Sequence, residues 1–78
     1  MIDVNVIQGV TVLSLDEVRM NPARAEIVRN FCATDIGMTC KAFVFDDAVG
    51  TVDKVELWGG SETQHSAFVK NLKHELRC

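Results

Sequence analysis

The fold of this chain is decided by one stretch, TCKAFVFDDAVGTVDKVELW, at residues 39–58. Its two halves are rich in β-branched and aromatic residues, which favour strands. Between them, Asp47 and Gly50 occupy the first and fourth positions of a type I turn, in which the glycine adopts a positive φ. We therefore predict an antiparallel hairpin made of strands 39–46 and 51–58.

The predicted turn also assigns the two faces of this hairpin, because it places Phe43 opposite Val55 and Phe45 opposite Asp53. The more apolar face, which should receive the helices, then carries Phe43, Phe45, Val55 and Leu57. The other face, which we expect to bind a partner, carries Cys40, Ala42, Val44, Lys54, Glu56 and Trp58. One residue more or less in the turn would exchange the two faces. Trp58 alternatively caps the core beside Gly59-Gly60.

Two helices are predicted on the flanks of this hairpin. Asn21-Pro22 supplies a capping residue and a first helical position, and an apolar stripe follows, so a helix should span residues 22–33. Ser61 and Gln64 form a capping box, which predicts a second helix from residue 62 to about residue 76. A further capping box, Ser14 to Glu17, predicts a short helical turn.

Residues 2–13 alternate apolar and polar side chains, which indicates strand. Gln8-Gly9 interrupts the alternation, so this segment is either a tight hairpin, which we favour, or one bent strand with a bulge. The complete order is strand or strands, helix, strand, strand, helix. It predicts a single α+β domain over residues 1–78, with two helices packed on one face of an antiparallel or mixed sheet.

Composition favours binding over catalysis. The chain has 78 residues, of which 47% are hydrophobic, and a net charge of −3. A domain of this size buries only ~60% of its unfolded surface, so a deep substrate cavity would remove core contacts. The negative charge argues against nucleic acid as a partner, because such affinity comes mostly from neutralised phosphates.

The cysteines and the lengths of the apolar runs indicate in which cellular compartment the protein is expected. The chain has three cysteines, an odd number, and no secretory hydrophobic region, so we expect a reduced cytoplasmic protein. Its longest apolar runs are far shorter than the ~20 residues that cross a membrane.

The residues that could carry chemistry form no recognised motif. Cys32, Cys40, His65 and His74 are potential zinc ligands, but their spacings are not those of zinc knuckles. Cys40 and His65 could form a thiolate–imidazole pair, although no third group is present to orient them. We therefore predict no metal, no cofactor and no catalytic residues.

Two further segments have structural interpretations that we prefer. Asp46-Asp47 resembles a magnesium-binding pair, but adjacent strand residues diverge, so we expect a charged turn. Gly59-Gly60-Ser61 precedes a helix but lacks the phosphate-loop pattern, so we expect a loop that leads into that helix.

We therefore expect a non-catalytic protein-binding module, a small intracellular inhibitor, regulator or adaptor of the kind carried by phages and mobile elements. The phage assignment follows from what small proteins of this size commonly do, not from particular residues. The first alternative is a homo-oligomeric structural domain that pairs the same sheet face with itself. The second is a small thiol- or metal-dependent enzyme that uses Cys40, His65 or Asp46.

Overall fold

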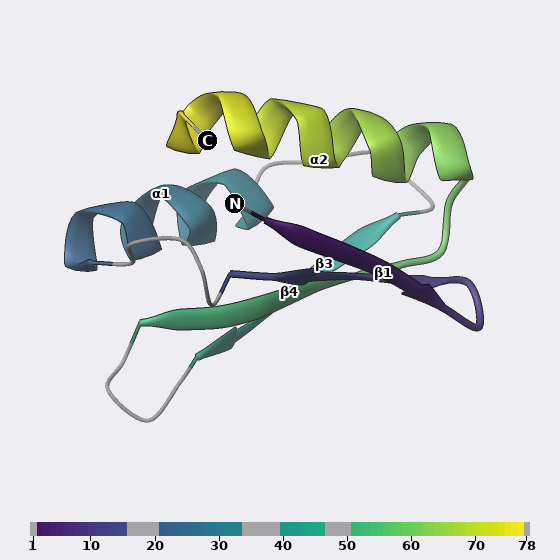
Figure 1. The fold of residues 1–78 in the computed structure, drawn as a ribbon, viewed down its shortest axis with the longest axis horizontal. Coiled ribbons are helices and arrows are strands. Elements are labelled where there is room, and N and C mark those ends of the chain that lie inside the picture. The colour runs from purple at the N-terminus through teal and green to yellow at the C-terminus, as the bar shows by residue number, and fades with distance from the viewer. Residues whose placement is uncertain (1, 16–20, 34–39, 47–50, 78) are drawn as a thin grey trace.

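The computed structural model describes residues 2–15, 21–33, 40–46 and 51–77. Four strands and two helices follow one another as β1 (Asp3–Ile7), β2 (Val10–Ser14), α1 (Pro22–Ala33), β3 (Lys41–Asp46), β4 (Val52–Trp58) and α2 (Glu62–Leu76). The strands form one antiparallel sheet in the order β1-β2-β4-β3. Both helices lie on the same side of the sheet (Figure 1). The predicted two-layer α+β fold and its element order are confirmed.

The first hairpin turns at Gln8-Gly9, as we favoured. Ile7 lies opposite Val10, which leaves only these two residues in the turn. Their φ angles are +50° and +82°. Positive φ at both central residues is the signature of a type I′ turn, whose twist matches that of the two strands. The alternative of one bent strand is therefore wrong.

Local capping sets the starts of both helices. The Asn21 side chain accepts a hydrogen bond from the Arg24 backbone N–H at 2.9 Å. At α2, the Ser61 hydroxyl accepts from the Gln64 backbone N–H at 3.2 Å, and the Gln64 side chain accepts from the Ser61 N–H at 2.8 Å. Both helices have the predicted bounds. The helical turn predicted after Ser14 falls largely on residues 16–20, outside the described residues.

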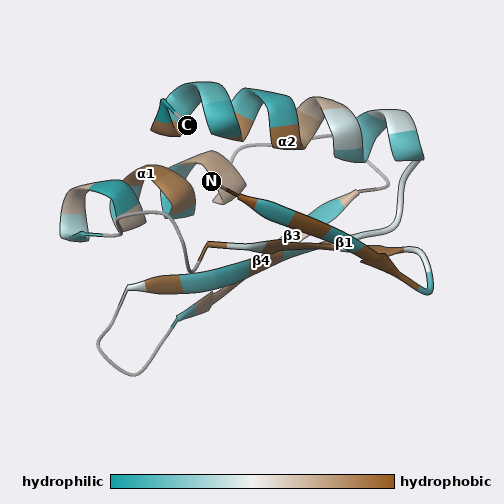
Figure 2. Cartoon of the chain, in the orientation of Figure 1, coloured by the Kyte–Doolittle hydropathy of each residue, from teal (hydrophilic) through white to brown (hydrophobic). Residues whose placement is uncertain are grey.

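The core lies between the sheet and the two helices. Its fully buried side chains are Leu13, Leu15, Val28, Val55, Leu57 and Leu72. Phe31 of α1 and Phe68 of α2 meet edge to face across the helix pair, with ring centroids 5.0 Å apart. The hydrophobic segments of α2 lie on its underside, toward the sheet (Figure 2). Burial of this apolar area stabilises the fold. Neither of the two described helices lies on the opposite side of the sheet (Figure 1).

The predicted register of the second hairpin is wrong by one residue over most of its length. Phe43 lies opposite Glu56 and Phe45 opposite Lys54, instead of Val55 and Asp53. The prediction for β4 is nevertheless correct from Lys54 to Trp58, where Val55 and Leu57 point inward and Lys54, Glu56 and Trp58 point outward as expected. The error therefore falls on β3, whose two faces are exchanged.

A β-bulge in β4 explains the exchange. The predicted pairing holds at Asp46 and Val52, next to the turn. One step later Phe45 faces Lys54, so two residues of β3 are matched by three of β4, and Asp53 is the additional one. A one-residue shift sends every following side chain to the other face. The turn itself, residues 47–50, lies outside the described residues.

The bulge places three predicted binding residues on the helix side of the sheet. Cys40 is only 3% exposed and belongs to the core. Ala42 and Val44 are partly buried and pack against the same core. Their predicted place on the free face is therefore wrong, and Phe43 and Phe45 take that place.

Candidate functional site

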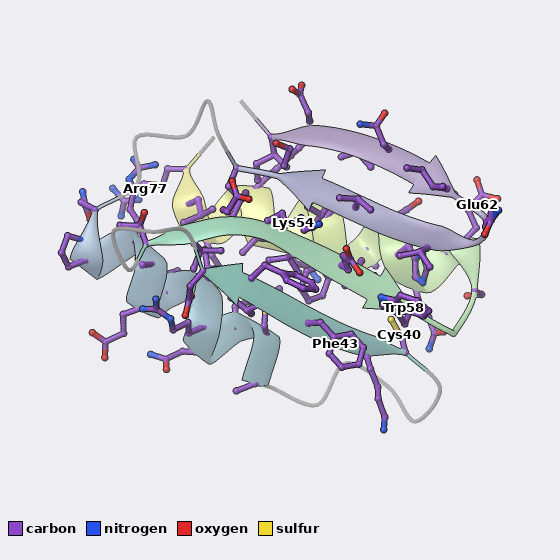
Figure 3. The ribbon with its side chains drawn as sticks, turned by 90° about the horizontal axis from the view of Figure 1, so that it is seen from below. Cys40, Phe43, Lys54, Trp58, Glu62 and Arg77 are labelled. Carbon is purple, nitrogen blue, oxygen red and sulfur yellow. The ribbon has the colours of Figure 1, made fainter. Side chains whose placement is uncertain are left out.

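The side of the sheet that no described helix covers, called the helix-free side below, carries a cluster that we call the aromatic face. It is made of Phe43, Phe45, Lys54, Glu56 and Trp58. Trp58 is 49% exposed, Phe43 47% and Phe45 40%. Figure 3 looks at this side and shows Phe43, Lys54 and Trp58 on the neighbouring strands β3 and β4. Large aromatic side chains are normally well buried, so three of them half-exposed on one face are informative.

The rings of the aromatic face are arranged by specific contacts. Phe43 and Trp58 meet edge to face, with centroids 6.3 Å apart and an interplanar angle of 90°. The Lys54 Nζ lies 4.7 Å from the centre of the Phe45 ring, which is a cation–π contact. These contacts hold the rings in defined positions although water reaches them.

Glu56 lies between Lys54 and Trp58 on β4, and its carboxylate interacts with both side chains. Its Oε1 accepts a hydrogen bond from the Trp58 indole N–H at 3.0 Å, and its Oε2 lies 3.2 Å from the Lys54 Nζ. The hydrogen bond from Trp58, and then that from Lys54, lowers the pKa of the Glu56 carboxyl. The carboxylate is thus charged and already engaged, and it fixes the orientation of the indole ring.

Between the rings lies an open hollow of about 300 Å³, lined by Phe43, Phe45, Glu56 and Trp58. Its lining is almost wholly apolar, with one carboxylate at its margin. A hollow of this kind can receive an apolar or aromatic side chain from another molecule. The hollow is open to solvent on its outer side.

Of the six predicted binding residues, the structure brings Lys54, Glu56 and Trp58 together on the aromatic face. Sequence reasoning missed Phe43 and Phe45, which it had assigned to the core. A signal for them was present, because the apolar residues Val52, Val55 and Leu57 of β4 do not keep a two-residue period. All three are buried, so the strand must change phase between Val52 and Val55.

His65 is buried and has partners on both ring nitrogens. Its Nδ1 lies 2.6 Å from the Thr11 hydroxyl, and its Nε2 lies 2.6 Å from the Gly59 carbonyl oxygen. A carbonyl only accepts, so Nε2 donates, and in the neutral ring the Thr11 hydroxyl donates to Nδ1. The imidazole therefore ties β2 to the start of α2, and neither nitrogen is directed at Cys40.

The two described cysteines are free thiols in apolar surroundings. Burial raises the pKa of Cys40, and it raises the pKa of Cys32 to about 11. A nucleophilic cysteine needs the opposite shift, toward the thiolate at neutral pH. Neither site has the electrostatics of an activated thiol.

The residues considered as a magnesium pair and as a phosphate loop have structural roles, as far as the structure describes them. Asp46 forms an ion pair with Arg29 at 3.0 Å, whereas Asp47 lies outside the described residues. Gly59 and Gly60 adopt φ near +75° and lead into the Ser61 cap. Within residues 2–15, 21–33, 40–46 and 51–77, no three His, Cys, Asp or Glu side chains gather as metal ligands would.

Neither described helix is long and apolar enough to span a bilayer.

No protein-family model, curated protein or solved structure matches this chain.

Proposed function

We propose that this chain is a non-catalytic protein-binding module that docks its aromatic face onto a larger protein. It would act as a small cytoplasmic inhibitor, regulator or adaptor. The observation that carries the proposal is the exposure of Phe43, Phe45 and Trp58, each between 40% and 49%, around one hollow on the side of the sheet that no described helix covers. Tryptophan and other aromatic residues are enriched at the energetic centres of protein interfaces.

Preorganisation supports this role. The Trp58 ring is held by Glu56 and by Phe43, so little side-chain entropy remains to be lost when a partner binds. Lys54 and Glu56 neutralise each other inside the cluster. The face therefore suits an apolar protein surface better than a strongly charged one.

Single-stranded nucleic acid is a less suitable occupant, although bases also stack on aromatic rings of a sheet. Such binding requires cations along the phosphate backbone. The Lys54 ammonium is engaged by Glu56 and Phe45, and the chain as a whole carries a net charge of −3. The experiment below includes this case as an outcome.

The test compares three single variants of the tagged chain as baits in a cell extract. Trp58→Ala and Phe43→Ala alter the aromatic face, and Ile27→Ala is the matched control, because Ile27 is an exposed apolar residue of α1 on the other side of the sheet. We expect a protein captured by the wild type and by Ile27→Ala to be lost with both other variants. Equal capture by all four chains, or capture of nucleic acid alone, would contradict the proposal.

The affinity is then measured through Trp58, which is the only tryptophan of the chain. Titration of the purified partner should shift the emission of Trp58 to shorter wavelength, since its indole loses contact with water. Circular dichroism melts of the variants serve as the folding control. An unshifted emission at saturating partner would place the binding elsewhere.

A second copy of the chain is the competing occupant of the aromatic face. In that case the Trp58 emission would shift with the concentration of the pure protein, in step with its mass. This outcome would favour the homo-oligomeric domain over the binding module.

A further inference from the structure

A second unpartnered surface lies at the opposite edge of the sheet, between β1 and α2. A groove of about 610 Å³ runs there, and Val4 and Val6 of β1 line one side while Val69, Lys70 and Lys73 of α2 line the other. Figure 3 shows β1 as the outermost strand, beyond the region of the sheet that α2 crosses. Val4 is 42% exposed and Val6 67%, although both belong to the helix side.

β1 lacks most of the features that normally protect an edge strand, and its only charged residue is Asp3 at its start. Such strands carry lysine, proline or a bulge, which prevents pairing with another chain. The strand Asp3–Ile7 reads DVNVI, and its pairing with β2 is regular throughout. Among the described residues, no strand pairs with its other side. The edge is thus open to a further strand.

The backbone of β1 presents its hydrogen-bonding groups to that edge in a fixed pattern. In a hairpin with a two-residue turn, the residues that flank the turn, Ile7 and Val10, exchange backbone hydrogen bonds. Along β1 the direction of these groups alternates. The N–H and C=O groups of Val4 and Val6 therefore point away from β2, toward the open edge.

We propose that β1 pairs with β1 of a second copy of this chain, antiparallel and centred on Asn5. The segment Val4-Asn5-Val6 reads the same in both directions. In this register each Val4 lies opposite the Val6 of the other copy, and the outward backbone groups of these residues bond to one another. The two Asn5 residues form the central pair, with their side chains on the face away from the helices.

The charges of the groove fit the same arrangement. Glu62 lies in the first turn of α2, while Lys73 and His74 lie in its last turn. A two-fold axis through the Asn5 pair makes the two α2 helices antiparallel. Glu62 of one helix then lies toward the Lys73 end of the other, whereas Lys70 lines the groove between these ends and stays in contact with water at its rim. Val4, Val6 and Val69 of both copies lie along the floor of the joined grooves.

The dimer would have one continuous eight-stranded sheet. The two-fold axis is perpendicular to the sheet, so both aromatic faces lie on the same side. The two β3 strands are seven strand spacings apart, roughly 33 Å along the sheet. If the proposed function holds, the dimer binds its partner at two sites; the β1 pairing itself does not depend on that function.

A disulfide tests the register directly. Cys78, the third cysteine of the sequence, is first replaced by serine. In this Cys78→Ser background, Asn5→Cys places two cysteines at the central pair, where Cα atoms lie ~4.5 Å apart, within the ~4.4–6.8 Å of disulfides. The matched control is Asp3→Cys in the same background. Its two cysteines would be four residues out of register, roughly 14 Å apart. We expect covalent dimers from Asn5→Cys under mild oxidation and monomers from the control. Equal cross-linking of both variants would overturn the proposal.

Sedimentation velocity tests the assembly without cross-linking. The wild type should double in mass over a micromolar to submillimolar series, with the Trp58 emission unchanged. Val6→Lys places a charge in the groove and should raise the dimer dissociation constant by at least about tenfold. Ile7→Lys changes the other face of the same strand, opposite Asp3 of the second copy, and should leave the dimer intact.

A wild type that stays monomeric over this series contradicts the proposal. So does a dimer that forms with a shift of the Trp58 emission, because it would use the aromatic face. Neither result affects the partner-capture experiment with Trp58→Ala, so failure of the β1 pairing can be told apart from failure of the proposed function.

Discussion

The two hairpins of this sheet differ in what sets their register. In β1–β2 the pairing is continuous from Asp3–Ser14 to Ile7–Val10, and the two-residue turn fixes it alone. In β3–β4 the register changes at Asp53, so the pairs from Phe45–Lys54 to Lys41–Trp58 are set by the bulge and not by the turn. A local turn is therefore a reliable guide to register only where the strands that leave it are regular.

The physical origin of the difference is the neighbourhood of β4. β4 is a central strand, paired with β3 on one side and β2 on the other. The Asp53 carbonyl accepts a hydrogen bond from the Leu15 N–H at 3.0 Å, just beyond the end of β2. The bulge residue thus has a partner that is distant in the sequence, whereas the Gln8-Gly9 turn needs none.

The largest expected effect separates the two faces of β4. Leu57→Ala removes a fully buried side chain and should lower the free energy of unfolding by about 2–5 kcal/mol. Trp58→Ala, one residue later on the outward face, should lower the free energy of unfolding by only about 1–2 kcal/mol, because the half-exposed ring loses its edge-to-face contact with Phe43 but leaves no buried cavity. Thermal melts followed by circular dichroism measure both, at ~4–8 °C per kcal/mol for a domain of this size. Similar losses for both variants would mean that the outward face of β4 is part of the core.

The next effect concerns the attachment of the first hairpin to α2. His65→Ala should lower the free energy of unfolding by about 1–3 kcal/mol, because it leaves the buried Thr11 hydroxyl and the Gly59 carbonyl without their partner. Urea unfolding of His65→Ala, Thr11→Val and the double variant gives the coupling between the two side chains. The double variant should cost clearly less than the sum of the single ones. Additive losses would show that the two side chains do not interact.

A smaller effect tests the tight turn of the first hairpin. Gly9→Ala should lower the free energy of unfolding by about 1 kcal/mol. An added Cβ at φ +82° meets no atom within 4 Å, so only the backbone strain of an alanine at positive φ remains. Gly60→Ala is the matched comparison, with φ +75°. There the Cβ would lie 2.9 Å from the Cys40 Cβ, so the loss in a urea titration should be larger. A neutral Gly9→Ala would argue against the type I′ turn.

Much of this architecture follows from the sequence, and the reasons are local. Asn21-Pro22 and the Ser61–Gln64 capping box determine where the helices begin, because each cap is satisfied within four residues. Gln8-Gly9 determines the first hairpin by its tolerance of positive φ. Such features depend little on the rest of the fold.

The candidate site was only half predictable for the opposite reason. Lys54, Glu56 and Trp58 were assigned to the free face correctly, because the alternation of β4 beyond the bulge is regular. Phe43 and Phe45 were not, because their side of β3 depends on a bulge that tertiary contacts stabilise. Two phenylalanines that sequence analysis assigns to a core thus became the main new members of the aromatic face.

The smallest expected effect is the pH response of the second hairpin. The pKa of Glu56 is lowered from its ordinary 4.5, so the contribution of its hydrogen bonds is fully present above that pH. This stabilisation of the folded state is lost as the pH falls through the lowered pKa that Glu56 has in the folded state. We expect the Trp58 emission to change over this acid range, while the fold persists. Glu56→Gln should abolish the change; persistence of the transition in that variant would assign it to another carboxyl.

The central claim is that the Asp53 bulge turns Phe43 and Phe45 to the helix-free side. Cross-strand nuclear Overhauser contacts between backbone protons of β3 and β4 test it most directly. We expect contacts that pair Phe43 with Glu56 and Val44 with Val55. Contacts that instead pair Phe43 with Val55 and Phe45 with Asp53 would return both phenylalanines to the core and contradict it.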